Sequence, residues 1–465
     1  MHTPPVRWTL LALCACSYAG SIRAADDPIA ARIVEIAKEE SRAYDKLAWL
    51  TDRIGHRLSG SAALDRAVEW AAAEFERDGL PRVWTDVVAV PHWVRGEESA
   101  QIVVPARHDL AILGLGGTIG TPDDGVTGEV VVVDGFEALE TLGEGARGKI
   151  VLFDRAMERG FDTDNGYDAL SKLRSRGASA AAKQGAIAML IRSLGTADYR
   201  LPHTGALRYE DDVAPIPAAA VSGEDAMLIS RLTRQGETVR VRLRLGARML
   251  PDAVSANVLA ELPGRERPEQ IVVIGAHLDS WDVGTGAHDD GAGCAIVMET
   301  MRLLKQHDLI PKRTIRAVLF TNEENGLRGA RDYAERYVDQ MTNHVAAIES
   351  DLGGDAPIGF GVTAGAGGAD IVGEIAAQLV SIGADRVIPR GGGADISLMK
   401  KFGVPQIGQL PDPTRYFDYH HTEADTLDKV ARDKLDLNVA AMAVMAYMLA
   451  ERDEPLPRIP QDERD

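Results

Sequence analysis

Hydrophobic residues follow two different spacings in this chain, and the change of spacing divides it into regions. After Asp27, apolar residues recur at helical spacing to about residue 50, and a second helical stretch, 59–78, ends at Gly79. Between residues 108 and 248, short apolar runs alternate with glycine-containing turns. We therefore expect helices that cover one face of a sheet, followed by a separate unit rich in β-strands.

From Asn257 onward, apolar runs of strand length alternate with helical stretches. The expected elements are strands at 258–262, 271–276, 315–321 and 345–348, with helices at 291–306 and 327–338. This alternation is typical of right-handed βαβ units. We predict an α/β fold with a mainly parallel mixed sheet flanked by helices, into which the β-rich unit is inserted.

The start of the chain has the pattern of an export signal. Arg7 precedes an apolar stretch at 8–19, and small residues lead to Ala24 and Ala25. This stretch is shorter than the roughly 20 residues that a membrane-spanning helix needs. A buried first helix is one alternative, and a lipid anchor on Cys16 is another. With a cleaved or a lipid-modified signal, the protein leaves the cytoplasm for the periplasm or the exterior.

These patterns predict five segments along the chain. They are a signal peptide at 1–25, the first part of the α/β unit at 26–107, the inserted unit at 108–248, the main part of the α/β unit at 249–455, and a C-terminal tail at 456–465. The tail lacks an apolar pattern and is expected to be disordered.

Charge and cysteine content exclude some classes of partner. The formal net charge is −19, which argues against nucleic acid or anionic membranes, because phosphate binding needs clustered Lys and Arg. No transmembrane segment is expected in the mature chain. Cys294 is the only cysteine outside the signal, so no intrachain disulfide can form. Its thiol lies near an expected helix start and could be nucleophilic, but a packed core residue is the simpler interpretation.

Acidic and imidazole side chains follow three of the predicted strands. His277, Glu324 and Asp351 each come just after such a strand, and two loops add Asp289 and His421. Ligands of open α/β sheets bind outside the carboxyl ends of the strands, so we expect these five residues to converge. Taken singly, each is more often a surface or turn residue, but five together at strand ends are improbable by chance.

The five side chains have the composition of a catalytic metal site. Carboxylates mixed with imidazoles suit zinc or a similar divalent ion. Five ligands can hold two ions only if one carboxylate bridges them, and Asp289 lies in a tight glycine-flanked turn suited to that position. Glu323, beside Glu324, is our candidate general base. Asp279, two residues after His277, is spaced to orient that imidazole, although a turn or helix cap would also explain it.

A longer motif carries a resemblance to a known family. The stretch His277-Leu278-Asp279-Ser280-Trp281-Asp282-Val283-Gly284, running on to Asp289-Asp290-Gly291, resembles the co-catalytic zinc exopeptidases of the aminopeptidase and transferrin-receptor type. Similar stretches at 91–100, 114–121, 190–193, 202–205 and 311–314 extend the resemblance over nearly all of the mature chain.

The resemblance implies a ligand set and a role for several residues. It assigns His277, Asp289 and Asp351 to one zinc, Asp289, Glu324 and His421 to a second, and the acid/base role to Glu323. His421 is preferred to its neighbour His420 because the family's ligand lies four residues before an acidic residue that Thr follows, here Asp425 and Thr426.

Substrate contacts and organisation are implied by the same resemblance. It makes 108–248 a protease-associated domain and places Asp395 in the substrate pocket, where it would sense an amine or would otherwise cap a helix. Tyr416 and Tyr419 could donate to the oxyanion, with aromatic packing as the alternative. Relatives also suggest a homodimer.

We therefore expect an exported di-zinc exopeptidase that cleaves dipeptides or short peptides with free termini, using water activated by the metals and by Glu323. Two rivals share the fold. One is a glutaminyl cyclase-like zinc acyltransferase, and the other is a receptor-like binding protein that has lost catalysis. The complete five-ligand set with Glu323 argues against both.

Overall fold

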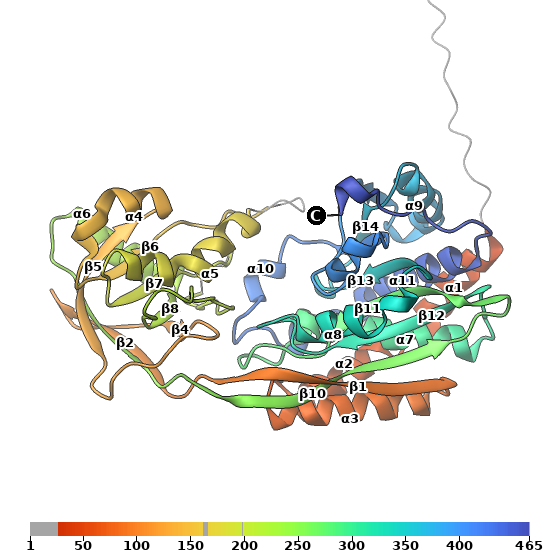
Figure 1. Cartoon of the computed structure of the whole chain (residues 1–465), viewed down its shortest axis with the longest axis horizontal. Helices are drawn as coiled ribbons and strands as arrows, with labels where there is room; N and C mark the ends of the chain where they lie inside the picture. The colour runs from red at the N-terminus through yellow and green to blue at the C-terminus, as the bar shows by residue number, and fades with distance from the viewer. Residues whose placement is uncertain (1–26, 161–165, 198, 465) are drawn as a thin grey trace, which may run out of the picture.

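The chain folds into a larger α/β unit and a smaller unit that projects from one end of it (Figure 1). The computed structural model describes residues 27–160, 166–197 and 199–464. The predicted signal peptide and Cys16 lie outside this range. Among the described residues, no helix combines the length and apolar character needed to cross a membrane.

The larger unit is built on an eight-stranded mixed sheet. Its strands, in spatial order, are β1 (Arg82–Val94), β10 (Arg248–Leu262), β12 (Arg313–Phe320), β11 (Arg267–His277), β13 (His344–Glu349), β16 (Gln406–Pro411), β14 (Pro357–Thr363) and β15 (Arg386–Ile388). The central strands β12, β11, β13 and β16 run parallel, whereas β1 and β10 pair antiparallel at one edge. The predicted α/β fold with a mainly parallel mixed sheet is confirmed.

Helices cover both faces of this sheet, which explains why its central strands are apolar throughout. Every residue of β12 and of β13 is buried. Along β11, Val272 and Ile274 pack into one core layer while Ile271 and Val273 pack into the other. The helices on the first face are α1 (Pro28–Glu40), α2 (Ala43–Trp49), α3 (Ala62–Arg77), α7 (Ala292–Gln306), α9 (Gly368–Ala376) and α11 (Arg432–Glu451), and α8 (Arg328–Arg336) lies on the second.

The smaller unit has a sheet of its own. In spatial order its strands are β3 (His108–Leu110), β2 (Glu98–Val104), β9 (Arg240–Leu245), β5 (Val126–Val133), β6 (Ile150–Phe153), β7 (Ala188–Arg192), β8 (Ala218–Val221) and β4 (Ile112–Gly114). Its helices are α4 (Phe136–Leu142), α5 (Tyr167–Lys183) and α6 (Gly223–Arg234). We call this part the insert.

The chain passes between the two units twice, at the same place. Val94 pairs with Arg248 at the end of the first sheet, and Glu98 pairs with Leu245 at the start of the second. Between these pairs a β-carbon on Gly96 would lie 2.5 Å from the carbonyl oxygen of Gly246. Because β2 already belongs to the second sheet, we propose that the insert begins at Gly96 rather than at residue 108.

The C-terminal tail is ordered, contrary to the expectation from its polar composition. Leu456 and Ile459 are buried, and the guanidinium of Arg458 donates to the carbonyls of Met341 and Phe402 at 3.0 and 2.7 Å. Two buried apolar side chains and the half-buried guanidinium of Arg458 therefore hold the segment against the larger unit. So few contacts do not produce a helical or strand pattern in the sequence.

Candidate metal centre

Three neighbouring strands end at one place and deliver the predicted residues there. His277 is the last residue of β11, Glu323 and Glu324 follow β12, and Asp351 follows β13. β11 lies between β12 and β13 and runs parallel to both. Asp289 arrives on the turn before α7, and His421 on the turn after α10 (Tyr416–Tyr419). All five predicted ligands are therefore brought together.

Asp289 stands between two groups of ligand atoms. Its Oδ1 lies 3.2 Å from His277 Nε2, which is also 3.2 Å from Asp351 Oδ1. Its Oδ2 lies 3.1 Å from His421 Nε2, which is 3.2 Å from Glu324 Oε2. One carboxylate thus presents a different oxygen to each group, which is the geometry a bridging ligand needs.

The hydrogen bonds of the two imidazoles determine which nitrogens are available. His277 Nδ1 lies 3.0 Å from the carbonyl oxygen of Asp279, and His421 Nδ1 lies 3.2 Å from that of Thr204. A carbonyl can only accept, so each Nδ1 carries the proton and each Nε2 presents a lone pair. Both lone pairs face carboxylate oxygens.

This arrangement fits divalent cations. Donor atoms around a tetrahedral zinc with bonds of roughly 2.0–2.1 Å are about 3.3 Å apart, close to the separations found here. Facing lone pairs repel one another unless a cation or proton lies between them. Although burial opposes it, the imidazoles of His277 and His421 hold the pKa of Asp289 well below its usual range. The residues therefore fit two metal ions that share Asp289.

His420, the alternative to His421, lies farther from the shared carboxylate. Its Nε2 is 3.5 Å from Asp289 Oδ2, and its ring stacks on that of His421 with 3.5 Å between centroids. The geometry favours His421, although His420 belongs to a cluster with Asp289 and His421 that could hold a metal.

Asp279 contacts both the first histidine and the glutamate pair, by different atoms. Its backbone oxygen binds the imidazole of His277, while its carboxylate accepts from the backbone N–H groups of Glu323 and Glu324 at 3.0 and 3.3 Å. The carboxylate therefore fixes the turn that carries the candidate base. Burial raises the pKa of the Glu323 carboxyl well above its usual range, as a group that must take up a proton requires.

A cavity of about 260 Å³ opens beside these ligands. It is lined by Asp289, Glu323, Glu324, Asp351, His420 and His421, by Leu352, Tyr416 and Phe417, and by Tyr167 and Arg174 of the insert.

The three predicted substrate residues differ in position. Tyr416 lines the cavity, and Asp395 is buried with no hydrogen-bond partner for its carboxylate among the described residues. Tyr419 instead stacks on His288 at 5.8 Å. Aromatic packing thus accounts for Tyr419.

Comparison with known proteins assigns the family. The sequence model of peptidase family M28 matches residues 257–446, which include all five candidate ligands, and that of the PA domain matches residues 126–229. Carboxypeptidase Q of Bos taurus is 41% identical over 90% of this chain and 88% of its own, and carboxypeptidase Q of Homo sapiens is 40% identical over 92% and 90%. The chain belongs to peptidase family M28.

Solved structures agree with this assignment or share the fold. The peptidase M28 precursor from Shewanella amazonensis superposes with a TM-score of 0.90 at 38% identity, covering 93% of this chain and 98% of its own. An aminopeptidase from Aneurinibacillus sp. strain AM-1, 23% identical with a TM-score of 0.63 over 92% of this chain and 98% of its own, shares the fold. As an M28 member, the protein is a zinc-dependent metallo-exopeptidase, which confirms the predicted enzyme class.

Sequence reasoning missed one buried cation that organises the M28 site. Arg57 is fully buried and donates to the carbonyl oxygens of Leu278, Thr285 and Gly286, at 2.5, 2.8 and 3.0 Å. These carbonyls lie within the segment between the first histidine and Asp289. No local pattern marks Arg57, because these three partners lie more than two hundred positions away in the chain.

Two buried carboxylates support the M28 ligands without facing the cavity. Asp290, which a cis peptide bond joins to Asp289, accepts from the N–H of His277 at 3.0 Å. Asp425 accepts from the N–H groups of His288 and Asp289 at 2.7 and 3.1 Å. Asp425 was visible in the sequence only as a spacing marker for the second histidine.

Cys294 does not line the cavity beside the M28 ligands. Its thiol is buried and contacts the carbonyl oxygen of His277 at 3.0 Å, and burial raises its pKa. The interpretation of a packed core residue is favoured over that of a nucleophile.

Proposed function

We propose that this protein is an exported di-zinc exopeptidase that hydrolyses dipeptides or short peptides with free termini. The observation that carries the proposal is Asp289, whose two oxygens each face a different imidazole with a free Nε2. A carboxylate so placed suits a pair of ions better than a single one. His277 and Asp351 would complete one ligand set, and Glu324 and His421 the other.

Glu323 is the residue to which we assign proton transfer. Its buried carboxyl lines the cavity next to the ligands and has a raised pKa, so it can take a proton from the attacking water and return it to the leaving amine. Bound zinc ions would supply polarisation of the scissile carbonyl and acidification of water. Tyr416 is the candidate donor to the oxyanion.

The cavity supports a small substrate with a charge at each end. Its volume of about 260 Å³ lies just below the range usual for small-molecule sites, roughly 300–1,000 Å³. Asp395 is not among the residues that line the cavity, but its buried carboxylate has no hydrogen-bond partner among the described residues and is our candidate for binding an amine. Burial raises its pKa well above its usual range, and an adjacent ammonium would favour ionisation.

Arg174 of the insert offers the opposite charge. Its Nη1 donates to the Tyr167 hydroxyl at 2.7 Å, and its Nε has no partner among the described residues. A guanidinium that is held in place and lines the cavity suits the free carboxylate of a short peptide.

The proposal is tested by metal content and substrate preference together. Purified protein should hold two zinc ions per chain and should hydrolyse free dipeptides much faster than the same dipeptides acetylated at the amino end or amidated at the carboxyl end. A single ion per chain, or equal turnover of blocked and free dipeptides, would contradict the proposal. Formation of pyroglutamyl product from an N-terminal glutamine substrate would instead support the cyclase alternative.

Export and assembly belong to the same proposal. The signal-like pattern at 1–25 supports cleavage near Ala25, or lipid modification of Cys16, in the cell that makes the protein. Mass spectrometry of the mature amino terminus distinguishes the two. A homodimer is supported by the family resemblance alone, and sedimentation velocity tests it.

A further inference from the structure

The insert makes direct hydrogen bonds to the loop that carries the second histidine ligand. Thr204 donates its N–H to the carbonyl of His421 at 3.0 Å, and its own carbonyl lies 3.2 Å from His421 Nδ1. One residue earlier, His203 Nδ1 lies 2.7 Å from the carbonyl of His420. Because that carbonyl only accepts, the His203 imidazole is the donor. His203 and Thr204 of the insert therefore form hydrogen bonds to His420 and His421 of the loop.

His203 and Thr204 are themselves held in place by hydrogen bonds within the insert. The N–H of His203 donates to Ser193 Oγ at 3.0 Å, and Ser193 in turn donates to the carbonyl of Val221 at 2.9 Å. Thr204 Oγ1 donates to the carbonyl of Gly114 at 2.8 Å. His203 and Thr204 are both buried. The carbonyl that faces His421 is thus held by the insert's own sheet.

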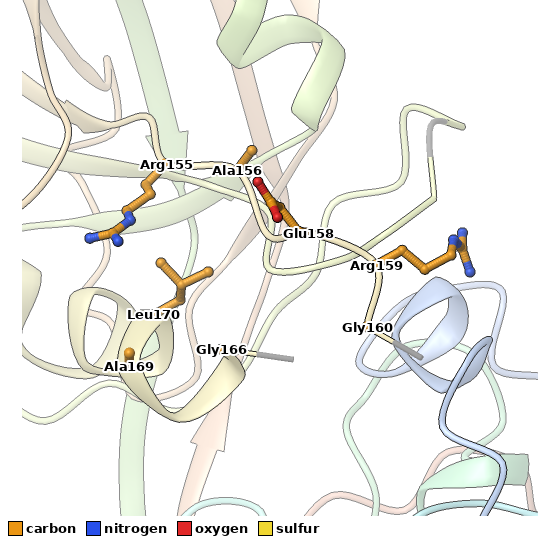
Figure 2. Close-up of a pocket in the computed structure, with 8 residues that line it drawn as sticks. All are labelled: Arg155, Ala156, Glu158, Arg159, Gly160, Gly166, Ala169 and Leu170. Carbon is orange, nitrogen blue, oxygen red and sulfur yellow. The ribbon is translucent and has the colours of Figure 1, made fainter. Parts of the chain in front are cut away.

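A second set of contacts ties the insert to α10, just before the histidine loop. Thr196 donates from Oγ1 to Asp418 at 2.8 Å and from its backbone N–H to the carbonyl of Phe417 at 3.1 Å. Arg159 forms two bonds to the same carboxylate, at 2.6 and 3.1 Å. Figure 2 shows Arg159 extending away from the hollow beside α5, toward the blue ribbon of the C-terminal segment.

The two histidine ligands differ in where their orienting partner comes from. The acceptor for His277 is the carbonyl of Asp279, two residues along its own chain segment. The acceptor for His421 comes from the insert, 217 positions earlier in the chain. Partners of this kind fix the tautomer and orientation of a ligating imidazole, and their loss commonly lowers metal affinity 10- to 100-fold, as an order of magnitude.

We propose that the insert contributes directly to the metal centre. Thr204, held in position by the adjacent His203, acts as a positioning residue for His421. Retention of the ion that His421 binds then depends on the docking of the insert, whereas retention of the ion at His277 does not. The inference rests on the proposed two-metal function. It adds that one of the two sites is completed by the protease-associated domain.

The test compares zinc affinities of the full-length protein and four variants by competition with a chelator of known affinity. His203→Ala removes the donor to the His420 carbonyl and should weaken one of the two zinc affinities, which we assign to the ion at His421, by about tenfold or more, leaving the other unchanged. His203→Asn places an amide donor near the position of Nδ1 and should restore most of the affinity.

Two further variants separate positioning from general stability. Thr196→Val is nearly isosteric and removes one bond to Asp418, so it should weaken the same zinc by about threefold. His108→Ala changes a histidine of the insert whose side chain is 44% exposed and bonds only within the insert, and should leave both affinities unchanged. Thermal melting of the metal-free forms verifies folding.

The outcomes discriminate between the inference and its premise. Two ions in the wild type, with unchanged affinities in folded His203→Ala and Thr196→Val, would overturn the inference and leave the proposed function standing. If His203→Ala does not fold, Thr196→Val decides alone, and an unchanged affinity there overturns the inference. Fewer than two ions in the wild type would overturn the proposed function and the inference with it.

Discussion

At the residue scale, backbone carbonyl groups orient the two histidines of the candidate metal centre. The carbonyls of Asp279 and Thr204 select one tautomer of His277 and His421 and leave the Nε2 atoms free. Arg57 gathers three further carbonyls around the turn that leads to Asp289. None of these groups reveals its role by residue type, because every residue has a carbonyl.

The role of Glu323 gives a prediction at this scale. Glu323→Gln keeps the shape of the side chain but removes its ability to accept a proton, so turnover of dipeptides should fall by at least ~100-fold while zinc content stays unchanged. Steady-state kinetics and elemental analysis measure the two quantities. Glu335→Gln, an exposed change on α8, serves as the control. Turnover within a few fold of wild type would remove Glu323 from the mechanism.

At the scale of elements, the packing of α8 against β13 depends on a neutral histidine. His344 begins β13 and is fully buried. Its Nδ1 donates to the carbonyl of Gln340 at 2.9 Å, and its Nε2 accepts from the Tyr333 hydroxyl at 2.8 Å. Burial lowers the pKa of His344 to about 4. The bond from Tyr333 of α8 and the bond to Gln340, which lies between α8 and β13, therefore both use the uncharged ring.

This histidine should make stability sensitive to acid. Its pKa in the folded state, about 4, lies below the value of about 6.5 expected in the unfolded chain, so the unfolded state takes up the proton first as pH falls. The free energy of unfolding should drop by ~3 kcal/mol from this group between pH 6.5 and 4. His344→Gln should lower stability at pH 7 and flatten that decline. If urea unfolding gives the same decline in the free energy of unfolding for both proteins across this pH range, the prediction is contradicted.

The crossing between the two sheets gives a second prediction for elements. Gly96 has φ +70° and lies against Gly246, so Gly96→Ala adds both backbone strain and a clash and should lower the free energy of unfolding by about 3 kcal/mol. Gly79→Ala is the matched control, because Gly79 has φ +79° with no neighbouring atom within 4 Å. The difference between the two variants, measured by denaturant unfolding, isolates the cost of the close approach. Equal losses of unfolding free energy in the two variants would mean that the added β-carbon at Gly96 causes no steric clash, which would contradict the prediction.

At the scale of the whole molecule, metal and fold should be coupled. The ligands come from segments scattered between His277 and His421 and meet only in the folded chain, so bound zinc stabilises the native state. The gain is about 4 kcal/mol when free zinc is 1,000 times its dissociation constant. Removing zinc with a chelator should therefore abolish turnover and lower the melting temperature, and added zinc should restore both. A melting temperature that the chelator does not change would contradict this prediction.

The sequence allowed us to predict the residues at the ends of the central strands, but not the residues whose partners lie on remote segments of the chain. His277, Glu324 and Asp351 were predictable because a buried parallel strand leaves a readable apolar run with its functional residue at the end. Arg57 and Thr204 were not, because their partners come from remote segments. Helix α11 was also missed. Its buried residues surround it almost completely, so it lacks the amphipathic period by which a surface helix is recognised.

The paired crossing at Gly96 and Gly246 has one more consequence. Val94 and Arg248 are already cross-strand partners, so a tight two-residue connection between them would close β1 and β10 into an ordinary hairpin and delete the smaller lobe without cutting the larger one. Such a shortened enzyme would keep its scaffold and all five ligand side chains. It would lose the Thr204 carbonyl opposite His421, the other hydrogen bonds from the insert to α10 and the histidine loop, and the cavity-lining side chains of Tyr167 and Arg174. Its folding and zinc content would show whether the larger unit needs the insert to fold or to hold zinc.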